Sequence, residues 1–169
     1  MMTRKELMRM MPVDAHDIAG AERVIEIGYP EIGPVMRDMV NTMRVGESPV
    51  ADAFAAYFGQ LGEGAVDAIG QGLMRENCSL RHRVFTMVLP HWPPEAVRRL
   101  TVVLGMVMSQ PDAWDNDLLC MEILARNRMI DLKGIGEWLS FKKRRWALRG
   151  ELLRKVEETL RNVQHPPAN

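Results

Sequence analysis

Three polar side chains near the start of the chain have the types and spacing of a metal site or a general base: Asp14, His16 and Asp17. Either kind of site needs a further ligand or a positioned partner. The other candidates, His82 and His91, lie far away in sequence. Because aspartates also cap helices and hydrogen-bond the backbone of loops, we expect these residues to be structural. A metal-dependent enzyme centred on His16 is the alternative.

Neither cysteine has the sequence context of a reactive thiol. Cys78 precedes the basic residues 81–83, and basic neighbours can activate a thiol. The sequence, however, places no general base against Cys78. Cys120 lies in an apolar run and is expected in the core. The sequence also lacks a phosphate-binding loop, a Gly-x-Ser-x-Gly nucleophile turn and a His-Glu-x-x-His zinc helix. We therefore expect no catalytic residue, no metal and no cofactor, and predict that the protein is not an enzyme.

Two surface features have the composition of a partner-binding site. The first is an acidic loop with a tryptophan, a residue enriched at interface hot spots; its residues are Asp112, Trp114, Asp115 and Asp117. Trp114 could equally close the end of the core. The second is a basic run with aromatic neighbours, made of Lys142, Lys143, Arg144 and Arg145. Such a run can bind nucleic acid by phosphate contacts and stacking, contact an acidic protein, or form the solvated face of an amphipathic helix.

The elements that carry these residues are predicted to be helices. Apolar residues recur at three- and four-residue spacing, and alternating β-branched runs are missing. Thr3 and Glu6 have the form of a capping box that opens a first helix, and Gly28 followed by Pro30 ends a second. Three helix pairs follow, over residues 32–62, 64–93 and 94–129. The predicted fold class is all-α.

The three pairs repeat with a period typical of solenoid proteins. The break before the second helix of each pair is rich in turn formers, at residues 46–49, 76–77 and 110–112. A two-helix unit of about 30 to 36 residues cannot bury its apolar face alone, so successive units are expected to stack. We predict a HEAT-like α-solenoid of about three helix pairs, preceded by an N-terminal helical segment, in residues 1–130. Residues 131–169 are predicted to form a C-terminal basic helical extension packed on the same domain.

Charge separates these two parts of the 169-residue chain, which has no net charge overall. Residues 1–130 hold 13 Lys and Arg against 17 Asp and Glu, whereas residues 131–169 hold 9 against 5. The acidic repeats make nucleic acid an unfavourable partner. No apolar run approaches the ~20 residues of a membrane span, and no secretory signal opens the chain. We therefore expect a cytoplasmic protein that does not contact a membrane.

Several short motifs stand out in the first half: Met11-Pro12-Val13-Asp14-Ala15-His16-Asp17, Ala21-Glu22, Gly28-Tyr29-Pro30, Pro34 and Pro49-Val50-Ala51. Together they resemble a small, mostly bacterial family, catalogued as domain of unknown function 5071, over about residues 11–128. The resemblance implies a compact, HEAT-like helical fold, and small bacterial proteins of this kind are frequently encoded as partners of toxins. The chain departs from the family at Ser48, where members often have an aromatic residue, and in the extension from about Asp131.

These observations favour a protein-binding module over an enzyme. Helical repeats offer an extended surface to another macromolecule, and the resemblance implies an immunity protein that masks a cognate toxin by steric occlusion. We expect the acidic loop, Trp114 and the basic helix to make the contacts. A nucleic-acid-binding helical repeat is the second hypothesis. The oligomeric state does not follow from the sequence.

Overall fold

The computed structural model describes residues 2–75, 77–110, 112–130, 133, 136–137, 140 and 150–164, and this part of the chain is helical without any strand. The prediction of an all-α fold is therefore confirmed. The elements are α1 (Arg4–Met10), α2 (Ile18–Ile27), η1 (Gly33–Val35), α3 (Met36–Thr42), α4 (Pro49–Leu61), η2 (Gly62–Ala65), α5 (Val66–Leu73), α6 (Cys78–Arg83), η3 (Val84–Val88), η4 (Leu89–His91), α7 (Pro94–Arg98), α8 (Thr101–Met108), α9 (Asn116–Arg126) and α11 (Gly150–Gln164). None of the described helices is long and apolar enough to span a membrane.

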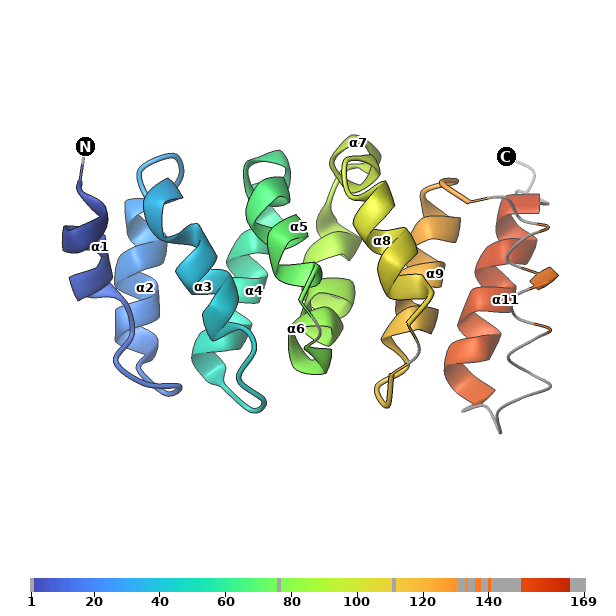
Figure 1. The fold of residues 1–169 in the computed structure, drawn as a ribbon, viewed down its shortest axis with the longest axis horizontal. Helices are drawn as coiled ribbons and strands as arrows, with labels where there is room; N and C mark the ends of the chain where they lie inside the picture. The colour runs from blue at the N-terminus through green and yellow to red at the C-terminus, as the bar shows by residue number, and fades with distance from the viewer. Residues whose placement is uncertain are drawn as a thin grey trace.

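The helices stand in a row, in chain order from one end of the molecule to the other (Figure 1). The first helices of successive pairs contact one another: α1 contacts η1, α3 contacts α5, and α5 contacts α8. The second helices form another such series, in which α2 contacts α4, α4 contacts η3, η3 contacts α9, and α9 contacts α11. Each pair therefore lies against its neighbours in two layers, and α11 closes the row, with Val156 fully buried.

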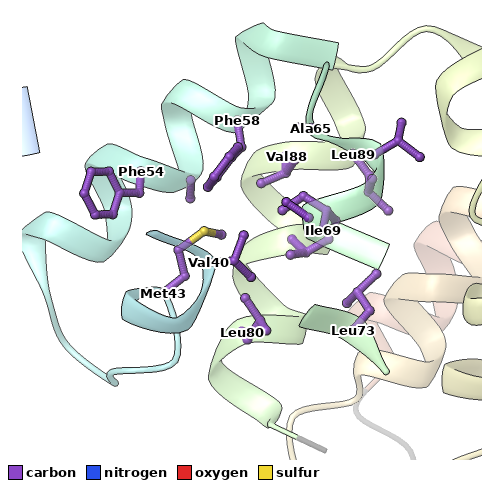
Figure 2. Close-up of a cluster of buried hydrophobic side chains, with 14 of the residues drawn as sticks. Val40, Met43, Phe54, Phe58, Ala65, Ile69, Leu73, Leu80, Val88 and Leu89 are labelled. Atoms are coloured by element: carbon purple, nitrogen blue, oxygen red, sulfur yellow. The ribbon is translucent and has the colours of Figure 1, made fainter. Parts of the chain in front are cut away.

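The core between the layers is aliphatic and aromatic (Figure 2). Helix α4 contributes Phe54 and Phe58 on one face, α5 contributes Ile69 and Leu73, and all four side chains are fully buried. The three- and four-residue spacing of these positions places them on one side of each helix. Burial of each large apolar side chain contributes about 1.5–3 kcal/mol. The three- and four-residue spacing of apolar residues in the sequence therefore marks the helix faces that pack against one another.

The ends of the helices follow local sequence signals. Thr3 and Glu6 form the predicted capping box of α1. Ser48 and Asn77 cap α4 and α6 by accepting hydrogen bonds from the backbone N–H groups of the first turn. Gly28, at φ 74°, ends α2 with a backbone conformation that favours glycine. The turn-forming breaks predicted from the sequence therefore fall at the starts of α4 and α6.

The pair over residues 64–93 departs from a regular α-helix. Residues 84–88 form one turn of π-helix, and the N–H of Leu89 donates to the carbonyl of Val84. Pro90 follows within the short η4 helix. Because proline has no N–H and its ring collides with the carbonyl four residues earlier, the α-helix cannot continue through this segment. Within the basic helical extension predicted for residues 131–169, α11 is described from Gly150, and residues 141–149 lie outside the described part.

Candidate functional site

The Asp14, His16 and Asp17 cluster orders the loop between α1 and α2. The Asp17 carboxylate accepts hydrogen bonds from the Gly20 N–H at 2.8 Å and the Val13 N–H at 3.1 Å. These two bonds lower the pKa of Asp17, the bond from Val13 most, because they stabilise the charged form. Asp14 accepts a hydrogen bond from the His16 N–H at 2.7 Å. The described residues contain no group of three or more potential ligands that could hold a metal ion.

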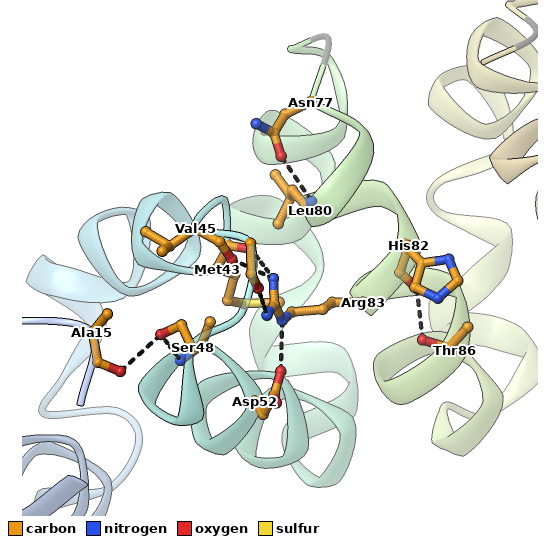
Figure 3. Close-up of polar contacts among 12 residues, drawn as sticks. Ala15, Met43, Val45, Ser48, Asp52, Asn77, Leu80, His82, Arg83 and Thr86 are labelled. Carbon is orange, nitrogen blue, oxygen red and sulfur yellow. Dashed lines mark hydrogen bonds and ion pairs between the residues drawn. The ribbon is translucent and has the colours of Figure 1, made fainter. Parts of the chain in front are cut away.

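This first loop is joined to the next loop at the start of α4. The Ser48 hydroxyl donates to the Ala15 carbonyl at 3.0 Å and also accepts from the Ala51 N–H at 3.1 Å (Figure 3). The Val50 N–H reaches the same Ala15 carbonyl at 3.4 Å. Ser48 is 2% exposed, so these bonds are shielded from water. One serine therefore caps α4 and fixes the α1–α2 loop against it.

Arg83 joins the α3–α4 loop to the next helix pair, over residues 64–93. Its guanidinium donates to the Asp52 carboxylate at 2.7 Å, to the Val45 carbonyl at 2.6 Å and to the Met43 carbonyl at 3.1 Å (Figure 3). It also donates to the Gly46 carbonyl. Arg83 is 8% exposed, and hydrogen bonds from a charged donor are among the stronger ones in proteins. The loop carbonyls are thus held by a single buried side chain.

The α8–α9 loop is tied in turn to α6. Asp112 accepts hydrogen bonds from the Trp114 N–H at 2.9 Å, the Asn116 N–H at 3.2 Å and the Asn116 side-chain amide at 3.0 Å. The same amide of Asn116, which is fully buried, donates to the Cys78 carbonyl at 3.0 Å. Asp112 therefore shapes the loop that carries Trp114, and Asn116 attaches that loop to the start of α6.

Trp114 is the large apolar side chain that this loop leaves in solvent. It is 46% exposed, and its indole ring meets the imidazole of His82 edge-on, with ring centroids 5.4 Å apart and planes at 74°. Asp115 adopts a left-handed conformation at φ 55° and is half-buried. Asp117 is fully buried in the first turn of α9. Of the acidic-loop residues predicted from the sequence, the structure therefore presents Trp114 most openly.

The two thiols are not activated. Burial raises the pKa of Cys78, and the neighbouring Asp112 carboxylate raises it further. Burial raises the pKa of Cys120 to about 12, and its thiol donates to the Leu104 carbonyl at 3.2 Å. Because the thiolate is the nucleophile, neither cysteine is poised for reaction at neutral pH.

Four loops share one edge of the row, the lower edge in Figure 1: they connect α1 to α2, α3 to α4, α5 to α6 and α8 to α9. We call this surface the loop edge; it consists of residues 11–17, 43–48, 74–77 and 109–115, of which residues 76 and 111 lie outside the described part. The bonds of Ser48, Arg83 and Asn116 link these loops to the neighbouring pairs. The basic residues predicted as a second contact surface, Lys142, Lys143, Arg144 and Arg145, also lie outside the described residues.

Sequence reasoning missed the residues that hold the loop edge together. Arg83 was read as one of several basic residues near Cys78, and its buried position depends on acceptors that lie 31 to 40 residues earlier in the chain. From the sequence, Ser48 belongs to a turn-forming break and departs from a family pattern, although Ser before Pro and Val also has the form of a helix N-cap. The N-cap role could have been found from the sequence, whereas the bond to Ala15 could not.

No protein-family model matches the chain, and neither a curated protein nor a solved structure matches it. The resemblance to domain of unknown function 5071 therefore stays a prediction.

Proposed function

We propose that the chain is a non-catalytic protein-binding module and that its two-layer row of helix pairs is a HEAT-like α-solenoid. The stacking of pairs in chain order supports the proposed solenoid, because each pair contacts its neighbours as repeats of a solenoid do. A row of this kind offers a long surface to another macromolecule. In the most specific form of the proposal, the partner is a toxin, and the chain blocks it by steric occlusion.

The presentation of Trp114 carries the proposal. A half-exposed indole on a free loop would lose conformational entropy on binding, but this loop is already held by Asp112 and Asn116. The edge contact with His82 orients the ring further. A partly exposed aromatic side chain on a loop that is already ordered is the usual form of an interface anchor. In the proposed complex, Trp114 enters a pocket of the protein partner.

A comparison of two aromatic residues tests the proposal. Trp114→Ala is expected to weaken capture of the partner from a lysate of the source organism by about 30-fold or more, since an anchor tryptophan contributes roughly 2 kcal/mol or more. Tyr29→Ala is the control: Tyr29 is 52% exposed and lies at the opposite edge, in the turn between α2 and η1. Equal capture by both variants, or capture of no protein by the unaltered chain, would contradict the proposed function.

A further inference from the structure

We propose that the partner docks along the whole loop edge, and that its docking surface combines apolar side chains with net positive charge. This inference rests on the proposed protein-binding function and names the surface and the kind of partner. Each of the four loops exposes one large apolar side chain. Their exposed fractions are 86% for Val13, 45% for Val45, 60% for Met74 and 46% for Trp114.

The distribution of these side chains is not that of scattered surface residues. The described chain has eight exposed large hydrophobic residues, and half of them lie in these four short loops. Turns are the positions where polar residues, glycine and proline are most easily accommodated, so nothing local requires an apolar side chain there. One apolar side chain in each successive loop forms a line along the row, as expected for a surface that meets a partner.

Three of the four loops are tied to neighbouring elements before binding. Ser48 fixes the first loop to the second, Arg83 holds the second loop against α6, and Asn116 holds the fourth against α6. The guanidinium of Arg81, 4% exposed, adds a bond to the Gln110 side chain at 2.8 Å. A surface whose loops are already ordered loses little conformational entropy on association. The hydrogen bonds thus keep the apolar side chains in a fixed relative arrangement.

The charge of the loop edge indicates the kind of partner. The described residues of the four loops include five acidic residues and two arginines: Asp14, Asp17, Glu47, Asp112 and Asp115 against Arg44 and Arg75. Asp14 and Glu47 are exposed. A phosphate backbone would be repelled by such a surface, whereas a basic protein surface would be attracted and would associate faster at low salt.

The dimensions of the loop edge fit a protein interface. Packed helices lie about 8–10 Å apart, so four successive loops form a ridge roughly 30 Å long. A standard interface covers ~800 Å² on each partner, a patch of about the same length. Trp114 alone would cover a small part of such a patch. The apolar side chains of the other loops supply the rest of the contact line.

Two matched triple variants of the full chain test the inference. The edge variant carries Val13→Ser, Met74→Ser and Trp114→Ser. The control variant carries Val102→Ser, Met106→Ser and Tyr29→Ser, which likewise remove one valine, one methionine and one aromatic residue, here from α8 and the opposite edge. Their exposed fractions are similar, at 79%, 46% and 52%. Circular dichroism and thermal unfolding show whether both variants keep the fold. The probe is a random peptide library displayed on phage and selected on the immobilised unaltered chain.

We expect the selected peptides to be rich in Lys and Arg interleaved with apolar residues. They should bind the control variant as they bind the unaltered chain, and bind the edge variant at least about tenfold more weakly. At low salt, Glu47→Lys should weaken peptide binding more than Glu26→Lys does. Glu26→Lys is the control, because it reverses a charge on the exposed side of α2.

Three outcomes would overturn the inference: no selected peptide, acidic or neutral peptides, or equal loss of binding in the edge and control variants. The proposed function can fail separately. If the selected peptides bind the loop edge but the unaltered chain captures no protein from the lysate, the surface stands as inferred and the proposed function does not.

Discussion

The contact between α4 and the π-turn at residues 84–88 gives a prediction about how closely the helix pairs stack. Gly59 lies in α4, and a Cβ atom added there would sit 2.7 Å from the Met87 carbonyl oxygen and 3.7 Å from the Val88 Cα. The nearest atom belongs to backbone, which cannot rotate away as a side chain can. The second layer therefore packs so closely at this point that an alanine forces α4 and η3 apart.

The steric cost of a Cβ atom at Gly59 can be separated from the effect of alanine on helix formation. Gly105 lies in α8, and a Cβ atom there would meet no atom within 4 Å. In both helices, alanine gains up to about 1 kcal/mol in helix propensity over glycine. At Gly59 the gain is opposed by overpacking, which typically costs about 1–3 kcal/mol. The difference between the two variants is thus the steric cost, about 1–3 kcal/mol.

Thermal unfolding of Gly59→Ala and Gly105→Ala measures that difference. For a chain of this size, 1 kcal/mol corresponds to about 2–4 °C in Tm. Gly105→Ala should unfold up to about 4 °C above the unaltered chain, and Gly59→Ala about 2–12 °C below Gly105→Ala. Equal Tm values for the two variants would refute the reasoning, because α4 and η3 would then not approach as closely as the structure shows.

Three further predictions concern the groups that hold the loop edge. Arg83→Leu should destabilise the fold by about 2–4 kcal/mol in urea unfolding, because it leaves loop carbonyls without their donor; a loss under 1 kcal/mol would contradict the role of Arg83. Asp112→Asn removes a carboxylate that raises the pKa of Cys78, so iodoacetamide should alkylate Cys78 faster at pH 8, and an unchanged rate would count against that contact. The folded-state pKa of Asp17 lies below its ordinary value of 3.8, so its stabilisation is present above that pH and is lost as the pH falls through the folded-state pKa. Asp17→Ala should therefore have a lower free energy of unfolding than the unaltered chain at pH 7, and the difference should disappear in acid. A difference that does not change with pH would contradict the stabilising role of the Asp17 carboxylate.

The helices could be predicted because their signals are local. The three- and four-residue spacing of apolar side chains, the Thr3 and Glu6 capping box and the turn-forming breaks act within a few residues of one another. The left-handed conformation of Asp115 and the π-turn at residues 84–88 were not predicted. Both depend on how the flanking helices pack.

The candidate site could be predicted only in part. Trp114 was singled out because tryptophan in an acidic loop suits a contact surface, and it is indeed half-exposed. The same reasoning grouped Asp112 and Asp117 with it, but a sequence does not reveal that one carboxylate caps the loop and the other is buried. Contacts such as Arg83 with Val45 join residues of different pairs, and they emerge only when the pairs are stacked.

Hydrogen exchange of the full chain, with and without the captured partner, tests the central claim most directly. The account predicts that backbone amides of the four loops, at residues 11–17, 43–48, 74–77 and 109–115, become protected together when the partner binds, whereas the turn at residues 28–32 on the opposite edge exchanges as before. Protection confined to that opposite edge, with the four loops unchanged, would contradict the claim that this protein binds its partner through the loop edge.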